Sequence, residues 1–277
     1  MSKRLIQLFD VSLRDGLQSL NKHLDSKSKR NILHNIISRN VKHIEVGSFV
    51  SPKILPQFED SLKLYNYATS LGMKDMNYYI LFPNSKQLSK GIDLGIENCS
   101  LITSVSDSFQ KKNINRSLDE TKIDLYKSFD LINNNKDKIN NVKLYVSCIN
   151  ECPISGKISP SVIVKELSYY FHNYKNITNL CLSDTCGTLN PTIFELIINH
   201  CVISEGIDLS KLSLHLHCNN HDIERIRSII QIAFNNNIFN IDVSLLESGG
   251  CSVTMDNDKI NRNLSYDDIS SLKLKYN

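Results

Sequence analysis

Short β-rich segments alternate with longer amphipathic segments along the whole chain, and this alternation constrains the fold more than any other feature. Strands that alternate with helices form parallel sheets through right-handed crossover connections. The length of 277 residues allows one barrel or two smaller domains, but eight strand–helix units without a linker favour a single (β/α)8 TIM barrel over residues 1–277. The predicted strands cover 6–11, 43–46, 78–82, 99–103, 143–148, 179–182, 213–217 and 240–245, and the predicted helices cover 26–39, 57–71, 119–133, 160–174, 191–205 and 221–236.

The composition is typical of a soluble globular protein, with 41% hydrophobic and 22% charged residues. A net charge of +3 is too small to indicate a nucleic-acid-binding protein, and no apolar run reaches the length of a membrane span. The first residues have neither the apolar core of a secretory signal nor the Arg-rich pattern of a transit peptide, so we expect a cytoplasmic protein. The eight cysteines are then expected to be reduced thiols.

A His-x-His motif lies in the predicted strand at 213–217. Residues two apart in a strand point to the same side, so His215 and His217 aim both imidazoles at one place. Two convergent imidazoles form half of a metal site, and Asp15 is the kind of hard ligand that would help to complete it. The alternative is ordinary packing of two histidines, and the spacing alone does not separate the two interpretations.

Polar residues at the ends of the predicted strands favour the metal site. The active site of a TIM barrel lies at the C-terminal ends of its strands, where buried charges are costly unless they are paired or bind a metal. Simpler roles stay open for some of these residues: Ser48 and Asn84 as loop caps, Glu45 in an ion pair, and Cys148 in the core. The residues at these strand ends are Arg14, Asp15, Glu45, Ser48, Asn84, Ser147, Cys148, Asp184, Thr185, His215, His217, Glu247 and 249–251.

Several of these residues belong to motifs that are similar to those of 3-hydroxy-3-methylglutaryl-CoA (HMG-CoA) lyase, a member of the DRE-TIM metallolyase superfamily. The similarity extends over nearly the whole chain. Ser-Phe-Val-Ser-Pro-Lys at 48–53 and Gly-Lys-Ile-Ser-Pro at 156–160 resemble the lyase specifically, whereas condensing relatives such as isopropylmalate and homocitrate synthases share only the Arg-Asp and His-x-His features. The other matching motifs are SLRDGLQ at 12–18, IEVG at 44–47, KKNIN at 111–115, YVSC at 145–148, CP at 152–153, LSDT at 182–185 and GGC at 249–251.

The resemblance implies a pyruvate carboxyltransferase/HMG-CoA lyase-like domain that cleaves HMG-CoA to acetyl-CoA and acetoacetate, assisted by Mg2+ or Mn2+. A divalent cation would make the tertiary hydroxyl of the substrate easier to deprotonate. The implied partner is an acyl-CoA, without nucleic acid or membrane, and a homodimer is one assembly compatible with the family. The implied metal ligands are Asp15, His215, His217 and Asn263; the implied catalytic residues are Arg14, Glu45, Asp184 and Cys251; the implied substrate contacts are Arg14, Gln18, Ser48, Asn84, Ser147 and Thr185.

Arg14 would stabilise developing negative charge on oxygen, and Glu45 and Asp184 would handle protons and orient the ligands and Arg14. The loop cysteine of the family, matched here by Cys251, is implicated in proton transfer.

The sequence departs from the family after His217 and after Cys251. Cys218 stands where the family usually has aspartate, and the segment after Cys251 is longer than the one that leads to the ligand asparagine of the family. The downstream context favours Asn263 for that ligand, with Asn261 and Asn257 as alternatives, and predicts a helix that begins around residue 266. The sequence also indicates a shortened C-terminal region.

Three functions therefore remain open. They are an active HMG-CoA lyase, another Claisen-type enzyme acting on an acyl-CoA or a 2-oxo acid, and a catalytically impaired, lyase-like barrel kept for binding or assembly.

Overall fold

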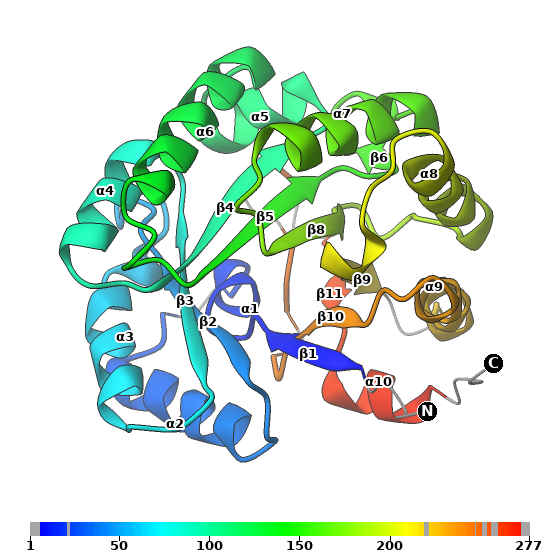
Figure 1. Ribbon diagram of the computed structural model, residues 1–277. Coiled ribbons are helices and arrows are strands. Elements are labelled where there is room, and N and C mark those ends of the chain that lie inside the picture. The colour runs from blue at the N-terminus through cyan, green and yellow to red at the C-terminus, as the bar shows by residue number, and fades with distance from the viewer. Residues whose placement is uncertain are drawn as a thin grey trace.

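Eight parallel strands close into a barrel in the computed structural model, which describes residues 6–20, 23–218, 222–246, 248–250, 254–255 and 260–272 (Figure 1). The strands follow one another around the barrel in chain order, and the last pairs with the first, as Gln7 lies opposite Asn240. The predicted (β/α)8 fold is confirmed. The barrel strands are β1 (Gln7–Asp10), β2 (His43–Ser48), β3 (Asn77–Phe82), β4 (Asn98–Ser104), β5 (Asn141–Ser147), β8 (Asn179–Asp184), β9 (Leu212–Cys218) and β10 (Asn240–Val243).

Helices on the outside of the barrel connect each strand to the next (Figure 1). Asn190 caps one of them, as expected, by accepting a hydrogen bond from the backbone N–H of Ile193, whereas Ser159 precedes its helix without a side-chain cap. The outer helices are α2 (Ser26–Ile37), α3 (Ser61–Ser70), α4 (Ser85–Asp93), α6 (Leu118–Asn133), α7 (Pro160–Asn173), α8 (Pro191–Ile203), α9 (Ile223–Asn235) and α10 (Tyr266–Ser271).

The loops of the barrel contain further short helices and strands. Two of them shape the site described below: α1 (Asp15–Gln18), directly after β1, and β11 (Arg262–Asn263), which pairs antiparallel with the end of β9. The others are α5 (Asp107–Ile114), the hairpin of β6 (Glu151–Cys152) and β7 (Gly156–Lys157), and the 3-10 turns η1 (Pro56–Phe58) and η2 (Leu209–Lys211).

Helix α4 was not among the predicted helices, and Gly91 in its last turn is unfavourable for a helix. The structure shows why a glycine is needed there: a Cβ at residue 91 would collide with the ring of Phe82, which is itself buried. The predicted helix at 57–71 is split into η1 and α3, and the predicted strand bounds agree with the structure to within two residues. A helix begins at Tyr266, as the sequence indicates.

The barrel interior holds charged residues as well as apolar ones. Lys143 and Asp242 are almost fully buried and form an ion pair of 2.5 Å between Nζ and Oδ1. The Lys143 ammonium also lies 3.5 Å from the centroid of the Phe9 ring, a favourable cation–π position. The seven described cysteines are all free thiols, and none of the described helices has the length and apolar character needed to cross a membrane.

Helix α10 is attached to the barrel through a buried hydrogen bond: the hydroxyl of Tyr266 donates to Oδ2 of Asp10 over 2.6 Å. Burial raises the pKa of Asp10 from 3.8 to about 6, although Tyr266 and Ser12 donate hydrogen bonds to it. Because this folded-state pKa is raised, ionisation of Asp10 destabilises the fold as the pH rises through it. Removing the Tyr266 hydroxyl, which donates to Asp10, would make the cost of ionising Asp10 larger.

Replacing Tyr266 with phenylalanine should therefore lower the free energy of unfolding by about 1–3 kcal/mol, and the loss should be larger at about pH 8 than at about pH 5. Urea denaturation at the two pH values measures it. Tyr174→Phe is a matched control, since that buried tyrosine donates to the neutral carbonyl of Lys122. An equal loss for Tyr266→Phe at both pH values would contradict the assignment.

Candidate active site

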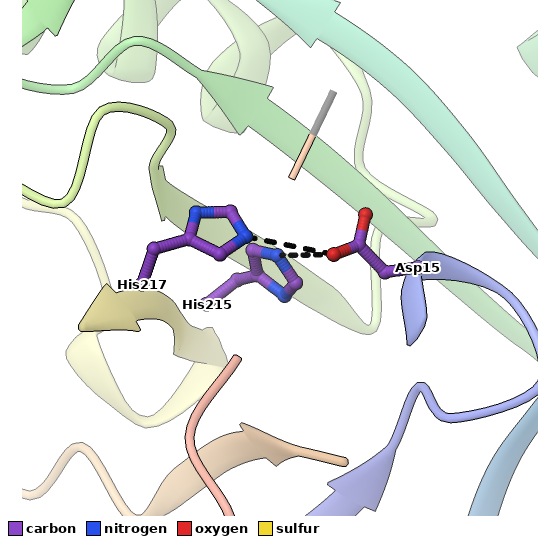
Figure 2. A group of neighbouring side chains, drawn as sticks. All are labelled: Asp15, His215 and His217. Carbon is purple, nitrogen blue, oxygen red and sulfur yellow. Dashed lines mark hydrogen bonds and ion pairs between the residues drawn. The ribbon is translucent and has the colours of Figure 1, made fainter. Parts of the chain in front are cut away.

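Asp15, His215 and His217 meet at the C-terminal end of the barrel (Figure 2). Asp15 is the first residue of α1, and both histidines point inward from β9. Oδ2 of Asp15 lies 3.7 Å from Nε2 of His215 and 3.5 Å from Nε2 of His217, and one ligand atom from each of the three lies within 4.8 Å of the others. All three side chains are buried, so the structure brings the predicted metal ligands together.

The other ring nitrogen of each histidine is held by an acceptor. Nδ1 of His215 donates to Oδ2 of Asp242 over 3.1 Å, and Nδ1 of His217 donates to the backbone carbonyl of Asp184 over 3.0 Å. Both imidazoles therefore present Nε2 to Asp15. This arrangement, with Nδ1 bound to a carboxylate or carbonyl, is the usual support of histidine ligands to metals. Burial also lowers the pKa of His215, which favours its neutral, metal-binding form. These residues fit a divalent cation.

Asn263 lies at the same place because β11 pairs with β9, which puts Asn263 opposite His217. It is 2% exposed, and its amide nitrogen donates to Oδ2 of Asp15 over 2.9 Å and to the carbonyl of Ser248 over 3.0 Å. The backbone N–H of Gly250 donates to the same Asp15 oxygen over 2.9 Å. Of the alternatives, Asn261 donates to the carbonyl of Cys186, and Asn257 is outside the described residues.

Arg14 is buried beside the cluster and carries two short ion pairs. Its Nε lies 2.5 Å from Oε2 of Glu45, and its NH1 lies 2.6 Å from Oδ1 of Asp15. The hydroxyl of Tyr145 donates to the same Glu45 oxygen over 3.1 Å, while the other Glu45 oxygen has no hydrogen-bond partner among the residues that the structure describes. Although burial acts against ionisation of Asp15, Arg14 and the two histidines hold the pKa of Asp15 well below its usual range.

A cavity of about 430 Å³ opens directly onto this cluster. Its volume is within the range of small-molecule sites. Arg14, Asp15, His215 and His217 form its floor. All five remaining residues that were expected to contact substrate contribute to its walls: Gln18, Ser48, Asn84, Ser147 and Thr185.

Three of these wall residues also have structural roles. The hydroxyl of Ser48 donates to the carbonyl of Leu81, the side chain of Asn84 caps α4, and Oγ1 of Thr185 accepts from the backbone N–H of Cys148. The alternative role of Asn84 as a cap is therefore confirmed, although the residue also lines the cavity. Ser183, which was not singled out from the sequence, lines the cavity beside Ser147 because the two lie opposite each other on β8 and β5.

Asp184 is placed differently from the expectation. Its carboxylate accepts from the backbone N–H groups of Thr188 and Leu189 and pairs with Arg225 at 3.3 Å, and it does not line the cavity. The contacts that orient Arg14 come from Glu45 and Asp15 instead. Asp184 reaches the site only through its backbone carbonyl, which fixes His217. Cys251 and Glu247 are outside the described residues.

The sequence interpretation missed Asp242 and its partner Lys143. A signal was present, because each is a charged residue within an apolar strand, at Asn-Ile-Asp-Val and Val-Lys-Leu-Tyr. We expect Asp242→Asn to weaken Mn2+ binding by about tenfold or more, since the loss of one such outer contact of a metal-bound histidine has effects of this size. Calorimetric titration with Mn2+ measures it. Asp208→Asn, a change of the exposed residue that precedes η2, is the control, and unchanged affinity of Asp242→Asn would contradict the role.

Known proteins are similar to this chain in sequence. The HMGL-like family profile matches residues 5–224. A mitochondrial hydroxymethylglutaryl-CoA lyase from Homo sapiens is 29% identical over 213 residues, which make up 76% of this chain and 62% of that protein. A hydroxymethylglutaryl-CoA lyase from Pseudomonas mevalonii is 26% identical over 219 residues, 76% of this chain and 67% of that protein. The chain thus spans less than two thirds of the human relative.

Solved structures show the same fold. The structure of an HMG-CoA lyase from Acenitobacter baumannii, in complex with coenzyme A and 3-methylmalate, has a TM-score of 0.83 at 24% identity and covers 96% of this chain and 82% of that chain. A hydroxymethylglutaryl-CoA lyase from Pseudomonas aeruginosa has a TM-score of 0.82 at 23% identity, over 97% of this chain and 84% of that chain.

Proposed function

Because the chain belongs to the HMGL-like family, we propose that it is a carbon–carbon lyase that cleaves HMG-CoA to acetyl-CoA and acetoacetate. The observation that carries the proposal is the cluster of Asp15, His215 and His217 at the floor of a cavity, with Arg14 beside it. The names of the relatives support the same reaction.

Asp15, His215 and His217 would hold Mg2+ or Mn2+, with the side-chain oxygen of Asn263 as a further ligand after rotation of its amide. When bound, such a cation acidifies the tertiary hydroxyl of the substrate and orients its carboxylate. Loss of the hydroxyl proton leads to a carbonyl at that carbon, the neighbouring carbon–carbon bond breaks, and the electron pair passes to the thioester as an enolate. A proton on the enolate carbon then gives acetyl-CoA.

Arg14 would stabilise the enolate oxygen, because its guanidinium lines the cavity and is held in place by Glu45 and Asp15. Preorganised donors of this kind lower the barrier since they need no rearrangement as the charge develops. Glu45 has one buried carboxylate oxygen that is unpartnered within the described part of the chain, but like Asp184 it does not line the cavity. Its proposed role is therefore to hold and orient Arg14, with which it forms an ion pair. The final proton is assigned to Cys251 on the family resemblance alone.

The cavity suits an acyl-CoA. Hydroxyls of Ser147, Ser183 and Thr185 line one wall and would contact the carboxylate end of the acyl group, and apolar residues such as Ile102 and Phe109 lie nearby. Lys112 and Arg116 lie at another part of the lining. Their positive charges would attract the phosphates of coenzyme A.

The test is an assay of the purified chain with HMG-CoA and Mg2+ or Mn2+, in which acetyl-CoA is measured by chromatography and acetoacetate by enzymatic reduction. We expect the two products in equal amounts and none after addition of a chelator. The matched inactive control is His217→Ala. A folded protein that binds Mn2+ but releases neither product would contradict the proposal, as would release of free coenzyme A, which indicates thioester hydrolysis.

A further inference from the structure

A pair of cysteines lies behind the cavity wall, in the segment that leads from β5 into the β6–β7 hairpin. Cys148 follows the last residue of β5, and Cys152 is the second residue of β6. The side chains of Cys148 and Cys152 interact, and this interaction lowers the pKa of Cys152. Neither residue belongs to the proposed metal site, and the reaction proposed above does not use them.

The Cys152 sulfur is surrounded by hydrogen-bond donors. The hydroxyl of Ser106 donates to it over 3.0 Å, and the backbone N–H groups of Ile154 and Ser155 donate over 3.4 Å each. The Ser108 hydroxyl lies 3.6 Å away. Such a cradle of hydroxyl and backbone donors stabilises an anion, so it favours the thiolate over the thiol.

The same sulfur lies at the beginning of α5. Ser106 is the N-cap of this helix, and its oxygen accepts from the backbone N–H of Phe109 while its hydroxyl donates to Cys152. The interaction with Cys148, together with the hydrogen bonds from Ser106 and Ser155, lowers the pKa of Cys152, although burial opposes this. Burial raises the pKa of Cys148, which stays protonated. The surroundings of the two sulfurs therefore differ: hydrogen-bond donors favour the thiolate at Cys152, and burial favours the thiol at Cys148.

Cys152 lies next to an exposed turn of the hairpin. The residue is itself buried, but Ile154 and Ser155, which cover it at the turn of the hairpin, are exposed. Opening of this turn would give a small oxidant access to the sulfur. The other buried thiols differ: for example, burial raises the pKa of Cys99 to about 12.

We propose that Cys152 is an oxidation site for small hydroperoxides and that Cys148 converts the oxidised residue into a Cys148–Cys152 disulfide. The Cys152 thiolate attacks one peroxide oxygen, the O–O bond breaks, and Cys152 becomes a sulfenic acid. The hydroxide that leaves takes up one proton from the solvent and becomes the first water. The Cys148 sulfur then attacks the Cys152 sulfur, the S–O bond breaks, and the Cys148 proton leaves with the hydroxide as a second water. Hydrogen peroxide is reduced to two waters and the two thiols are oxidised to one disulfide.

The disulfide would act on the cavity through Cys148. The residue before it, Ser147, lines the cavity, and the backbone N–H of Cys148 donates to Oγ1 of Thr185 over 2.9 Å. Cys148 has a φ of 65°, so its backbone has little freedom to adjust. Formation of the Cys148–Cys152 disulfide therefore shifts the segment around Cys148, which supports Ser147 and Thr185 in the cavity wall. Reduction by a dithiol restores the original conformation of this segment.

The experiment is peptide mass spectrometry of the intact protein after brief treatment with hydrogen peroxide and alkylation of the remaining thiols. Trypsin releases both cysteines on one peptide, residues 144–157, and Cys99 alone on residues 91–111. We expect the 144–157 peptide to lose two hydrogen masses and both alkylation sites, and to regain them with dithiothreitol. Cys99 should be modified at least about tenfold more slowly.

Variants assign the two roles. Cys148→Ser should leave Cys152 as a sulfenic acid that dimedone traps, whereas Cys152→Ser should abolish oxidation of the peptide. Ser106→Ala should slow oxidation, because one donor to the Cys152 sulfur is lost, and Cys99→Ser is the matched control. The peptide measurement on the wild-type protein tests the proposal even if one of these variants does not fold. Oxidation of Cys152 at the rate of Cys99 would overturn the proposal, as would a cross-link from Cys152 to the nearby Cys186 in place of Cys148.

Discussion

Asp15→Ala is expected to weaken binding of Mn2+ by more than about a hundredfold, beyond the effect of losing an outer contact. The change removes the only acidic member of the cluster, whose ligand atoms lie within 4.8 Å of one another in the described part of the chain. It also leaves the guanidinium of Arg14, now paired with Glu45 alone, beside the cation site. Calorimetric titration of the purified variant measures the affinity.

His217→Ala should have a comparable effect, because it removes the Nε2 ligand while the salt bridge between Arg14 and Asp15 stays intact. Asp208→Ala, a change of an exposed acid, serves as the control. Wild-type affinity in both Asp15→Ala and His217→Ala would show that the cation binds elsewhere, even if HMG-CoA were still cleaved.

Arg14→Lys is expected to keep Mn2+ binding and to lose turnover by about a hundredfold or more, as the loss of one preorganised donor does in other enzymes. Lysine preserves the positive charge between Asp15 and Glu45, but it cannot hold both with two separate nitrogens and still face the cavity. The measurement is kcat with HMG-CoA at saturating Mn2+, beside the Mn2+ affinity of the same preparation.

Arg14→Ala is less suitable, since it leaves Glu45 buried with Tyr145 as its remaining donor among the described residues. Breaking a buried ion pair in this way destabilises a protein by about 3–5 kcal/mol. Thermal unfolding of Arg14→Lys must therefore match that of the wild type before kcat is interpreted. Normal turnover in a folded Arg14→Lys variant would remove Arg14 from the catalytic step.

The strands and the composition of the site were predictable because the information is local. Apolar β-rich runs mark the barrel strands, and the topology of a parallel barrel brings the ends of all strands to one face. It was therefore possible to group Asp15 with His215 and His217, although the hydrogen bond between Asp15 and His217 spans 202 positions of sequence. The position of Asn263 near this group followed from the residues downstream of it.

The partners of the site residues were decided by the tertiary structure alone. Asp184 is the last residue of β8 and His217 the second last of β9, so the two have similar places in the pattern. The carboxylate of Asp184 nevertheless turns toward Arg225, because the loop that follows offers it two backbone N–H groups. Lys143 and Asp242 are 99 positions apart, and no periodicity links them. Lys143 and Asp242 form their ion pair only because the closed barrel brings β5 and β10 to face each other.

Helix α4 and the pair of Cys148 and Cys152 also separate what the sequence determines from what the tertiary structure decides. The sequence by itself determined that eight strands would close a barrel and that acids and imidazoles would meet at its rim, since the spacing of apolar and polar residues is set by strand geometry. Whether Gly91 breaks a helix or admits the Phe82 ring, and which donors surround the Cys152 sulfur, depends on contacts between distant segments. Packing decided the helix at Gly91, and hydrogen bonding decided the surroundings of Cys152. The intrinsic helix propensity of a residue is weak where tertiary contacts compete with it.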